Sequence, residues 1–292
     1  MINPTTSLIL FGGLVTVHAF GVTKIDSARH NWSLKYWKES EMFFPTMRAL
    51  ATYAPINAHI FAPYPTDFNA KVVNYSKFNE KREHDGITLW RGPKADGVVL
   101  HAARTAFAVS SADCATLVVS YEDLQRKPFV IVAHAGRNSL IDMEHFKEGK
   151  ASRAKESVVH SILEMIPRKC RQNAQAWVGI AMEPGEHFAH SKNNPLHSHN
   201  AHLIDYILKN YGEDCLRDDG SRLPEGRNAF NKGWLDIKKL IKEQLVRGGL
   251  RRENIVLDNI CTYQDKKTGE HVWYSQVREK NMRNLVLVSR VA

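Results

Sequence analysis

Five short apolar runs constrain the fold of this chain more than any other feature of its sequence. Each run is rich in β-branched or aromatic residues and is bounded by polar or turn residues, which is typical of buried β-strands. Three longer segments repeat apolar residues at helical spacing. Because strands and helices interleave without regular βαβ alternation, we expect a single α+β domain over residues 1–292, with a mainly β-sheet core flanked by helices. The expected strands are 105–110, 129–134, 176–181, 255–260 and 285–291, and the expected helices are 152–166, 201–211 and 234–246.

Two polar stretches and one apolar stretch complete the organisation of the chain. Residues 63–93 are polar and charged, and residues 184–233 are rich in Asn, Gly, Asp and His. Both are expected to be largely irregular, the second as an insertion-like loop. The apolar stretch 8–22 is too short to span a bilayer and lacks the preceding positive charge of a signal peptide. It is expected to form two buried strands joined at Gly12-Gly13.

The bulk composition limits the partners of this chain. The net charge is +9, and 43% hydrophobic residues provide a sizeable core. Because the basic residues are spread out, the charge favours sites for anionic small molecules over a nucleic-acid surface. The four cysteines form no Cys-x-x-Cys pair, which indicates a reducing, cytoplasmic environment. We expect no membrane partner, and a monomer or a homodimer.

Residues 95–137 place a cysteine and a histidine at the ends of two expected strands. The first strand leads into Ser111-Ala112-Asp113-Cys114, and the second ends in His134-Ala135-Gly136. Functional side chains often occupy such positions, where a rigid scaffold meets the loops. Cysteine and histidine together suit either thiolate chemistry or the ligation of a soft metal ion. Asp113 would orient a ligand or cap the turn.

The order of these motifs resembles the YfiH-like family, also called the laccase-domain or multicopper polyphenol oxidoreductase family. The resemblance implies a YfiH-like α+β fold. It depends on a series of short landmarks in one order, each of which is weak alone. They are Ala95-Asp96-Gly97, Ser111-Ala112-Asp113-Cys114, His134-Ala135-Gly136, Trp177-Val178-Gly179-Ile180-Ala181-Met182, Leu235-Asp236-Ile237, Cys261-Thr262, Ser275-Gln276-Val277-Arg278-Glu279 and Met282-Arg283.

This resemblance implies a metal site. Family members bind one metal ion, usually zinc and less expectedly copper, through His, Cys and His, which assigns Cys114 and His134 as ligands. The family's first histidine lies in a Gln-Val-His-Gly segment that this chain lacks, and His84 is the best candidate for it. An alternative alignment leaves no third histidine and therefore no bound cofactor. It places Pro65-Thr66-Asp67 at that position, and weaker histidine candidates are His59 and His101.

The resemblance also implies a reaction. The family's activity is phosphorolysis of purine nucleosides to the base and ribose 1-phosphate, with adenosine deamination in some members. The implied partners are therefore a small-molecule nucleoside and phosphate. Arg137 stands one position away from the arginine of the family's Trp-Arg-Gly segment, and a surface position is the alternative for the other two arginines. The implied catalytic residues are Cys114, His134 and Asp113, and the implied phosphate ligands are Arg137, Arg48 and Arg278.

Two other functions remain open for the same residues. Cys114 as nucleophile and His134 as base would make a metal-free cysteine hydrolase or amidase. The missing Gln-Val-His-Gly segment and the altered Trp-Arg-Gly segment also fit a non-catalytic binding module. The histidine-rich stretch 187–202 forms either a second metal site or a solvated, helix-capping stretch.

Overall fold

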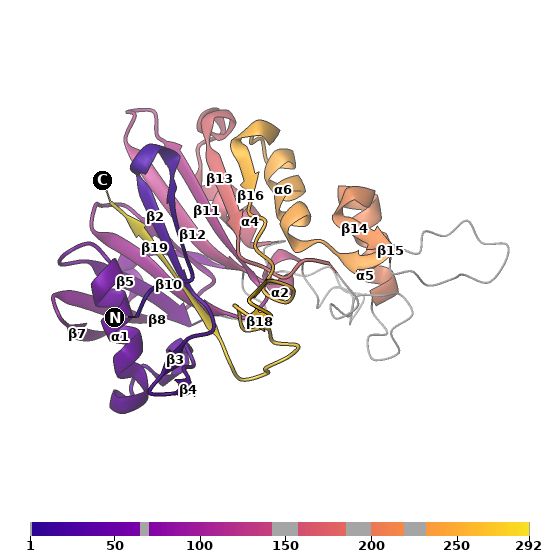
Figure 1. Ribbon diagram of the computed structural model, residues 1–292. Coiled ribbons are helices and arrows are strands. Elements are labelled where there is room, and N and C mark those ends of the chain that lie inside the picture. Colours follow the sequence, from indigo (N-terminus) through magenta and orange to yellow (C-terminus); the bar gives the residue numbers. More distant parts are fainter. Residues whose placement is uncertain (1, 65–69, 142–156, 185–199, 219–231, 292) are drawn as a thin grey trace.

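Two large mixed β-sheets pack face to face in the computed structural model, which describes residues 2–64, 70–141, 157–184, 200–218 and 232–291 (Figure 1). The seven-stranded sheet has the order β1 (Thr6–Leu10), β2 (Val15–Phe20), β19 (Asn284–Arg290), β10 (Thr105–Ser111), β5 (His59–Tyr64), β8 (Ile87–Lys94) and β7 (Glu80–His84). The six-stranded sheet has the order β16 (Ile255–Leu257), β13 (Gln175–Gly179), β11 (Ala115–Glu122), β12 (Pro128–Ala135), β9 (Gly97–Leu100) and β6 (Val72–Asn74).

Alternate side chains along the strands build separate layers of core, because successive residues of a strand point to opposite faces of a sheet. Phe107 and Val109 of β10 share a buried cluster with Val118 of β11 and Val132 of β12, which lies between the two sheets. The intervening Ala108 belongs to the cluster on the outer face of the seven-stranded sheet. The short apolar runs of the sequence are thus buried on both faces.

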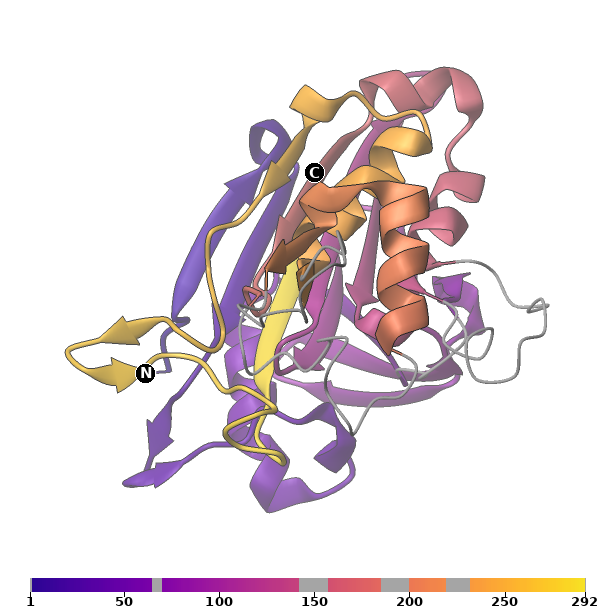
Figure 2. The same cartoon turned by 90° about the vertical axis from the view of Figure 1, so that its right-hand side faces the viewer.

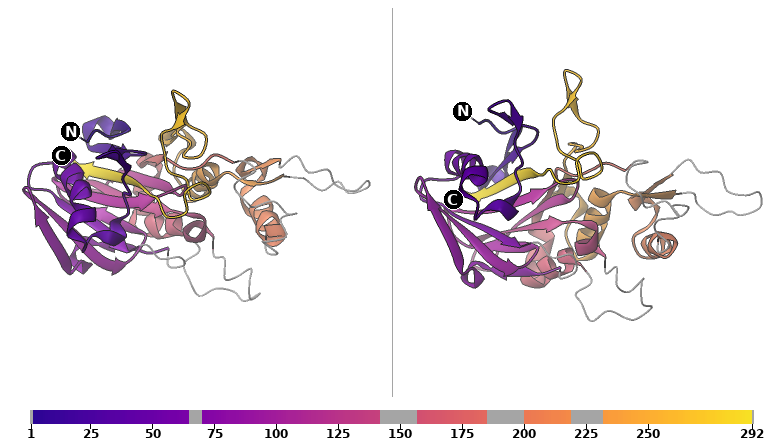
Figure 3. Two further views of the ribbon diagram at one scale, coloured as in Figure 1. Left: turned by 60° about the horizontal axis from the view of Figure 1, so that its bottom comes forward. Right: turned by 90° about the horizontal axis from the view of Figure 1, so that it is seen from below.

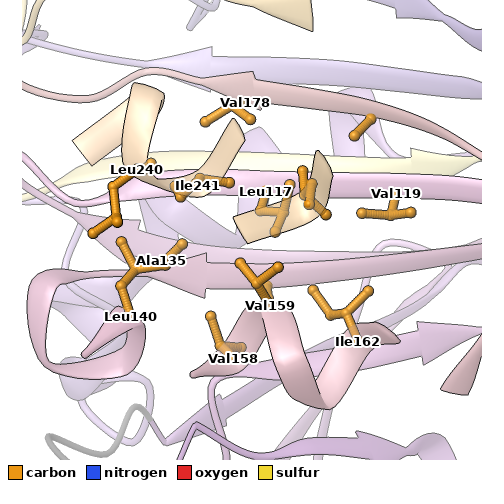
Figure 4. Packing of buried hydrophobic residues seen from close by; sticks show 14 of the residues in the cluster. Leu117, Val119, Ala135, Leu140, Val158, Val159, Ile162, Val178, Leu240 and Ile241 are labelled. Carbon is orange, nitrogen blue, oxygen red and sulfur yellow. The ribbon is translucent and has the colours of Figure 1, made fainter. Parts of the chain in front are cut away.

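Helices cover the outer face of each sheet (Figures 2 and 3). Helix α1 (Ser40–Tyr53) packs Met47 and Leu50 against the seven-stranded sheet. Helices α4 (Val158–Met165) and α6 (Ile237–Arg247) cover the six-stranded sheet, where Val159 and Ile241 share a cluster with Leu117 of β11 (Figure 4). The result is a four-layer α/β/β/α arrangement. Among the described residues, none of the helices is long and apolar enough to cross a membrane.

Shorter elements connect these layers. The remaining helices in the described ranges are α2 (Arg137–Leu140) and α5 (Asn200–Tyr211). Three two-stranded pairs lie outside the large sheets: β3 (Lys24–Ile25) with β4 (Ala28–Arg29), β14 (Leu216–Asp218) with β15 (Lys232–Leu235), and β17 (Lys266–Lys267) with β18 (Glu270–His271). The 3-10 turns are η1 (Phe11–Gly13), η2 (Leu34–Tyr36), η3 (Tyr75–Lys77), η4 (Arg168–Asn173), η5 (Glu213–Cys215) and η6 (Arg252–Asn254).

The predicted α+β fold class is confirmed, and so are most of the predicted elements. Strands β10, β12, β13, β16 and β19 occupy the five predicted positions, and α4, α5 and α6 occupy the three predicted helices. Helix α6 begins at Ile237, later than predicted, because the Asp236 side chain accepts a hydrogen bond from the backbone of Lys239 and caps the helix. The preceding Trp234 belongs to β15.

The N-terminal pair of strands is also confirmed. Strands β1 and β2 are antiparallel and are joined by η1, which contains Gly12 and Gly13. Only β2 is well buried, since Ile9 of β1 is 75% exposed. β1 is the edge strand of its sheet, and alternate side chains along it are exposed.

The prediction that residues 63–93 are irregular was wrong. This stretch contains β6, β7 and most of β8 in the residues that the structure describes. Strand β7 was missed because it carries the charged run from Glu80 to His84 and lies at a sheet edge, where only β8 pairs with it. In residues 184–233 the described part holds α5, β14 and the start of β15, while most of the histidine-rich stretch 187–202 lies outside the described residues.

Candidate functional site at the Cys114 end of the sheets

Three neighbouring strands bring Cys114, His134 and Asp96 to one end of the six-stranded sheet. Cys114 directly precedes β11, at the point where the chain passes from β10 of one sheet to the other sheet. His134 lies near the end of β12, which is antiparallel to β11. Asp96 directly precedes β9, which is antiparallel to β12, and its carbonyl accepts a hydrogen bond from the backbone of His134 at 2.8 Å. The antiparallel order therefore fixes this grouping.

The His134 ring lies between a thiol and a carboxylate. Its Nδ1 is 3.7 Å from Oδ1 of Asp96, which is fully buried, and its side chain is 18% exposed. Burial alone would lower the pKa of His134, but the negative charge of Cys114 and the Asp96 carboxylate outweigh it and raise the pKa well above its usual range. Without a metal ion, His134 is therefore held as an imidazolium between Cys114 and Asp96. Cys114 itself is partly exposed and can be reached by a substrate.

Gly136 leaves space for the side chains of Cys114 and His134 because it has no side chain of its own. A methyl group in place of the Gly136 hydrogen would lie 3.0 Å from Sγ of Cys114 and 3.2 Å from Cε1 of His134. Both distances are shorter than ordinary van der Waals contact, so a side chain here would press on both groups. The glycine of the His134-Ala135-Gly136 motif thus has a packing reason at the site itself.

Asp113 anchors the turn that presents Cys114. Its carboxylate is 4% exposed, and one oxygen accepts a hydrogen bond from Thr262 Oγ1 at 2.8 Å. The other accepts from Ser275 Oγ at 3.1 Å and from the backbone of Gln276 at 2.8 Å. The backbone of Asp113 has a φ of 102°, in the left-handed region that side chains rarely adopt. Burial raises the pKa of Asp113 despite the hydrogen bonds. Both oxygens are bonded within the fold, so this carboxylate holds the turn that presents Cys114.

Two arginines from different segments of the chain interact electrostatically with Cys114. Burial lowers the pKa of Arg137, the first residue of α2, and that of Arg283, which precedes β19. In both cases the negative charge of Cys114 partly offsets this effect, which shows that both guanidinium groups lie within electrostatic reach of the thiol. The site therefore combines a Cys–His–Asp group with two half-buried positive charges.

The structure separates His84 from this pair. Thr88 of β8 aligns with His59 at the start of β5, and His59 aligns with Thr105 at the start of β10. His84 precedes Thr88 across a tight turn, whereas Cys114 follows the far end of β10. A seven-residue strand spans about 20 Å, so His84 lies at the opposite end of the sheet. Its own contacts are Asp85 and the ring of Phe44.

The other predicted phosphate ligands have separate positions. Arg48 is exposed on α1, the helix that covers the outer face of the seven-stranded sheet. Arg278 donates hydrogen bonds to the backbone carbonyls of Tyr263, Trp273 and Thr262, the last two at 2.6 and 3.4 Å. It thereby ties together the segments that supply Asp113 with its donors. Of the three predicted arginines, only Arg137 lies beside Cys114.

The donor set fits a metal ion only in part. Cys114 and His134 are neighbouring soft ligands, and at metal sites a ligating histidine commonly has a carboxylate beside its other ring nitrogen, as His134 has Asp96. A catalytic zinc site uses three protein ligands. Within the described ranges, no three His, Cys, Asp or Glu side chains come close enough together to hold a metal ion. The alternative segment 65–67 falls outside the described residues.

The fold of this chain is similar, over nearly its whole length, to three solved structures of YfiH-like proteins. The hypothetical protein YfiH from Bacillus licheniformis superposes with a TM-score of 0.58 at 17% identity, over 94% of this chain and 92% of that protein. NMB0706 of Neisseria meningitidis, described under DUF152, gives 0.57 at 15% identity, over 95% and 94% of the two chains. YlmD from Geobacillus stearothermophilus gives 0.54 at 17% identity, over 95% and 92%.

These comparisons establish the fold and not the reaction. The three descriptions name no activity. No protein-family model matches the sequence, and no curated protein matches it either. The predicted resemblance to the YfiH-like family is therefore confirmed at the level of the fold, over nearly the whole chain.

The structure also adds residues that the sequence analysis did not assign to the site. Asp96 and Arg283 belong to landmarks of the resemblance, yet neither was predicted as a functional residue. The same is true of Thr262 and Ser275, which both bind Asp113. All four residues stand in the short motifs that carry the resemblance, which was the available signal. Two of those motifs supply the partners of Asp113 in the turn before Cys114.

Proposed function

We propose that this chain is a YfiH-like enzyme that cleaves purine nucleosides with phosphate at the Cys114 end of the sheets. The observation that carries this proposal is the grouping of Cys114, His134 and Asp96 with the guanidinium groups of Arg137 and Arg283. Arginine suits phosphate because its planar donors bind two oxygens at once. The YfiH-like fold and the motif resemblance support a nucleoside as the second substrate.

The proposed reaction exchanges one bond at the ribose. A phosphate oxygen bonds to C1′, and the bond from C1′ to the base nitrogen breaks, with its electron pair going to the base. The base then takes up one proton. In this proposal Arg137 and Arg283 hold the phosphate, and in the metal-free site the His134 imidazolium supplies the proton. Cys114 and Asp96 keep His134 charged and oriented. Positioning and electrostatic stabilisation would then supply most of the rate.

Zinc is the cofactor that the resemblance implies, and it would change the role of the pair. With zinc bound, Cys114 and His134 would be ligands, and a third ligand would come from outside the described residues. Bound zinc would supply a Lewis acid that polarises an oxygen of a substrate or of water. Metal content therefore decides between a proton-donating and a metal-binding His134.

The first experiment measures metal content and phosphate dependence together. Protein prepared without a histidine tag is analysed by elemental mass spectrometry, as wild type and as Cys114→Ala. The same samples are incubated with inosine or adenosine, with and without phosphate, and free base, ribose 1-phosphate and ammonia are quantified. Base release that requires phosphate and is lost in Cys114→Ala supports the proposal. The absence of base release from all common purine nucleosides, with and without added zinc, would refute it.

A metal-free cysteine hydrolase is the second candidate, and one observation favours it. The series Cys114, His134 and Asp96 has the composition of a nucleophile, a base and an orienting acid. A mild electrophile such as iodoacetamide should then label Cys114 rapidly in chelator-treated protein, and Cys114→Ser should abolish the labelling. Hydrolase activity would also release product without phosphate, which separates it from phosphorolysis.

A further inference from the structure

A cavity lies at the Thr105 end of β10, opposite the end that leads to Cys114. Its volume is ≈ 450 Å³, and Thr105, the first residue of β10, forms part of its wall. Cys114 follows the last residue of the same strand, about 20 Å away for a strand of this length. The cavity therefore does not belong to the Cys114 site. Its size is within the range of small-molecule pockets. The rings that line it are His59, Phe61, Tyr75, Phe78, Trp90 and His101.

These rings form a connected set and not a random apolar surface. Phe61 lies with its ring centroid 5.1 Å from Phe78 and 6.0 Å from Tyr75. Tyr75 in turn lies 5.6 Å from His101, in an edge-to-face arrangement. Tyr75 remains 51% exposed, although aromatic surface of this size is usually covered. Part of the Tyr75 ring therefore remains open to solvent beside the cavity.

The walls are polar in places but carry no formal charge. The Trp90 indole nitrogen donates to His59 Nδ1 at 3.0 Å. Since an indole nitrogen can only donate, His59 Nδ1 is the acceptor of this bond, which leaves Nε2 as the donor of the ring. Burial, Lys127 and Arg290 all lower the pKa of His101, which favours the neutral form of this ring. The lining includes no Asp, Glu, Lys or Arg.

We propose that this cavity binds a neutral, planar heteroaromatic molecule of one or two fused rings, in the size class of a free purine base. Aromatic side chains stack on any base because every base has a π-face. The His59 Nε2–H supplies a donor for a ring nitrogen or a carbonyl oxygen at the edge of such a molecule. A charged ligand would lose its hydration here, and none of the residues that line the cavity is an acidic or basic partner in direct contact. The proposal does not depend on the reaction at Cys114.

The test uses Trp90 as a reporter in the wall of the cavity. The full chain is produced with 5-fluorotryptophan in its six tryptophan positions. The ¹⁹F signal of Trp90 is assigned by its loss in Trp90→Phe. Adenine is then titrated as the probe, with cyclohexanol as a non-aromatic compound of similar ring size. We expect a saturable shift of the Trp90 signal with adenine and none of comparable affinity with cyclohexanol.

Two variants separate stacking at this cavity from other effects. Tyr75→Ala removes an exposed ring and should weaken adenine binding at least about fivefold, the lower limit for one stacked base. Phe44→Ala removes a ring that is 50% exposed on α1, away from the cavity, and should leave binding unchanged. Cys114→Ala should also leave it unchanged. An absent shift at the solubility limit of adenine, equal binding of cyclohexanol, or loss of the response in Cys114→Ala would each overturn the proposal.

Discussion

The two ends of β10 use the same scaffold for opposite kinds of environment. At the Cys114 end the strand leads into a strained turn, two buried carboxylates and a histidine whose pKa is raised. At the Thr105 end the cavity is lined by aromatic rings, and His101 in its wall has a lowered pKa. The difference shows that one rigid strand can hold charge at one end and exclude it at the other, because the loops decide which side chains gather there.

The Cys114 end should lose its activity completely when its thiol is removed. In Cys114→Ala we expect a fall in phosphorolysis of about 10³-fold or more, as when a member of a catalytic group is deleted. The adenine response of Trp90 should remain, since the two ends share only the strand. Cys170→Ala, which removes a free thiol that is buried on η4, away from the site, is the control. A comparable loss in Cys170→Ala would mean that the effect comes from the fold.

Substitution of Asp113 tests whether the turn before Cys114 is needed for activity at this end of β10. In Asp113→Asn one oxygen becomes an NH₂ group, which must face donors from Thr262 or from Ser275 and Gln276. The mismatch should destabilise the chain by about 1–3 kcal/mol in urea unfolding. Activity should fall by about 10–100-fold, as it does for other residues that orient a reacting group.

A matched variant separates positioning by Asp113 from stability. Ser275→Ala removes a single donor and leaves the carboxylate with two partners, so its effects on both measurements should be smaller. The rate of iodoacetamide labelling of Cys114 as a function of pH gives a readout of the thiol itself. If Asp113→Asn lowers stability but leaves that pH profile and the kcat unchanged, Asp113 has no positioning role.

Gly136 tests how closely the pair is packed. In Gly136→Ala the new methyl group would lie 3.0 Å from Sγ of Cys114, so the thiol must move. We expect about a tenfold loss of kcat/KM, because small displacements of a reacting group are costly. Gly269→Ala, in the β17–β18 turn at a φ of +85° with open space around it, is the control. It should lower stability without lowering kcat/KM, and equal losses of activity in both variants would contradict the packing argument.

The sequence predicted the scaffold of the Cys114 end better than its electrostatics. Apolar, β-branched runs identified β10 and β12, and the strand ends correctly marked Cys114 and His134 as neighbours. Asp96 was not assigned, because its approach to His134 depends on β9 pairing with β12, which no local pattern reveals. His84 was chosen for its position before a strand, but it is the last residue of β7, which lies three positions from β10 in the sheet order.

The cavity at the Thr105 end of β10 was not predicted from the sequence, for a related reason. Its rings come from β5, η3, β8 and the segment after β9, which are far apart along the chain and meet only through sheet pairing. Trp90 also lies in the stretch 63–93 that was predicted to be irregular. A charged edge strand such as β7 gives a weak strand signal, since one of its sides needs no partner. Non-local pairing therefore accounts for what the sequence did not predict.

The two histidines should respond to pH in opposite directions, which is the smallest but most direct test of the contrast. In chelator-treated protein, the raised pKa of His134 means that its imidazolium stabilises the fold below the usual value of 6.5 and that this contribution is lost as the pH rises through the raised pKa. The lowered pKa of His101 means that its neutral form stabilises the fold above 6.5, and this contribution is lost as the pH falls through the lowered pKa. NMR titration of the ring Cε1–H signals measures both pKa values.

Two variants test the cause of each shift. Cys114→Ala should lower the pKa of His134 alone, and Lys127→Ala should raise the pKa of His101 alone. If both histidines titrate near 6.5, the two ends do not differ in charge, and the contrast between them reduces to the shapes of their walls.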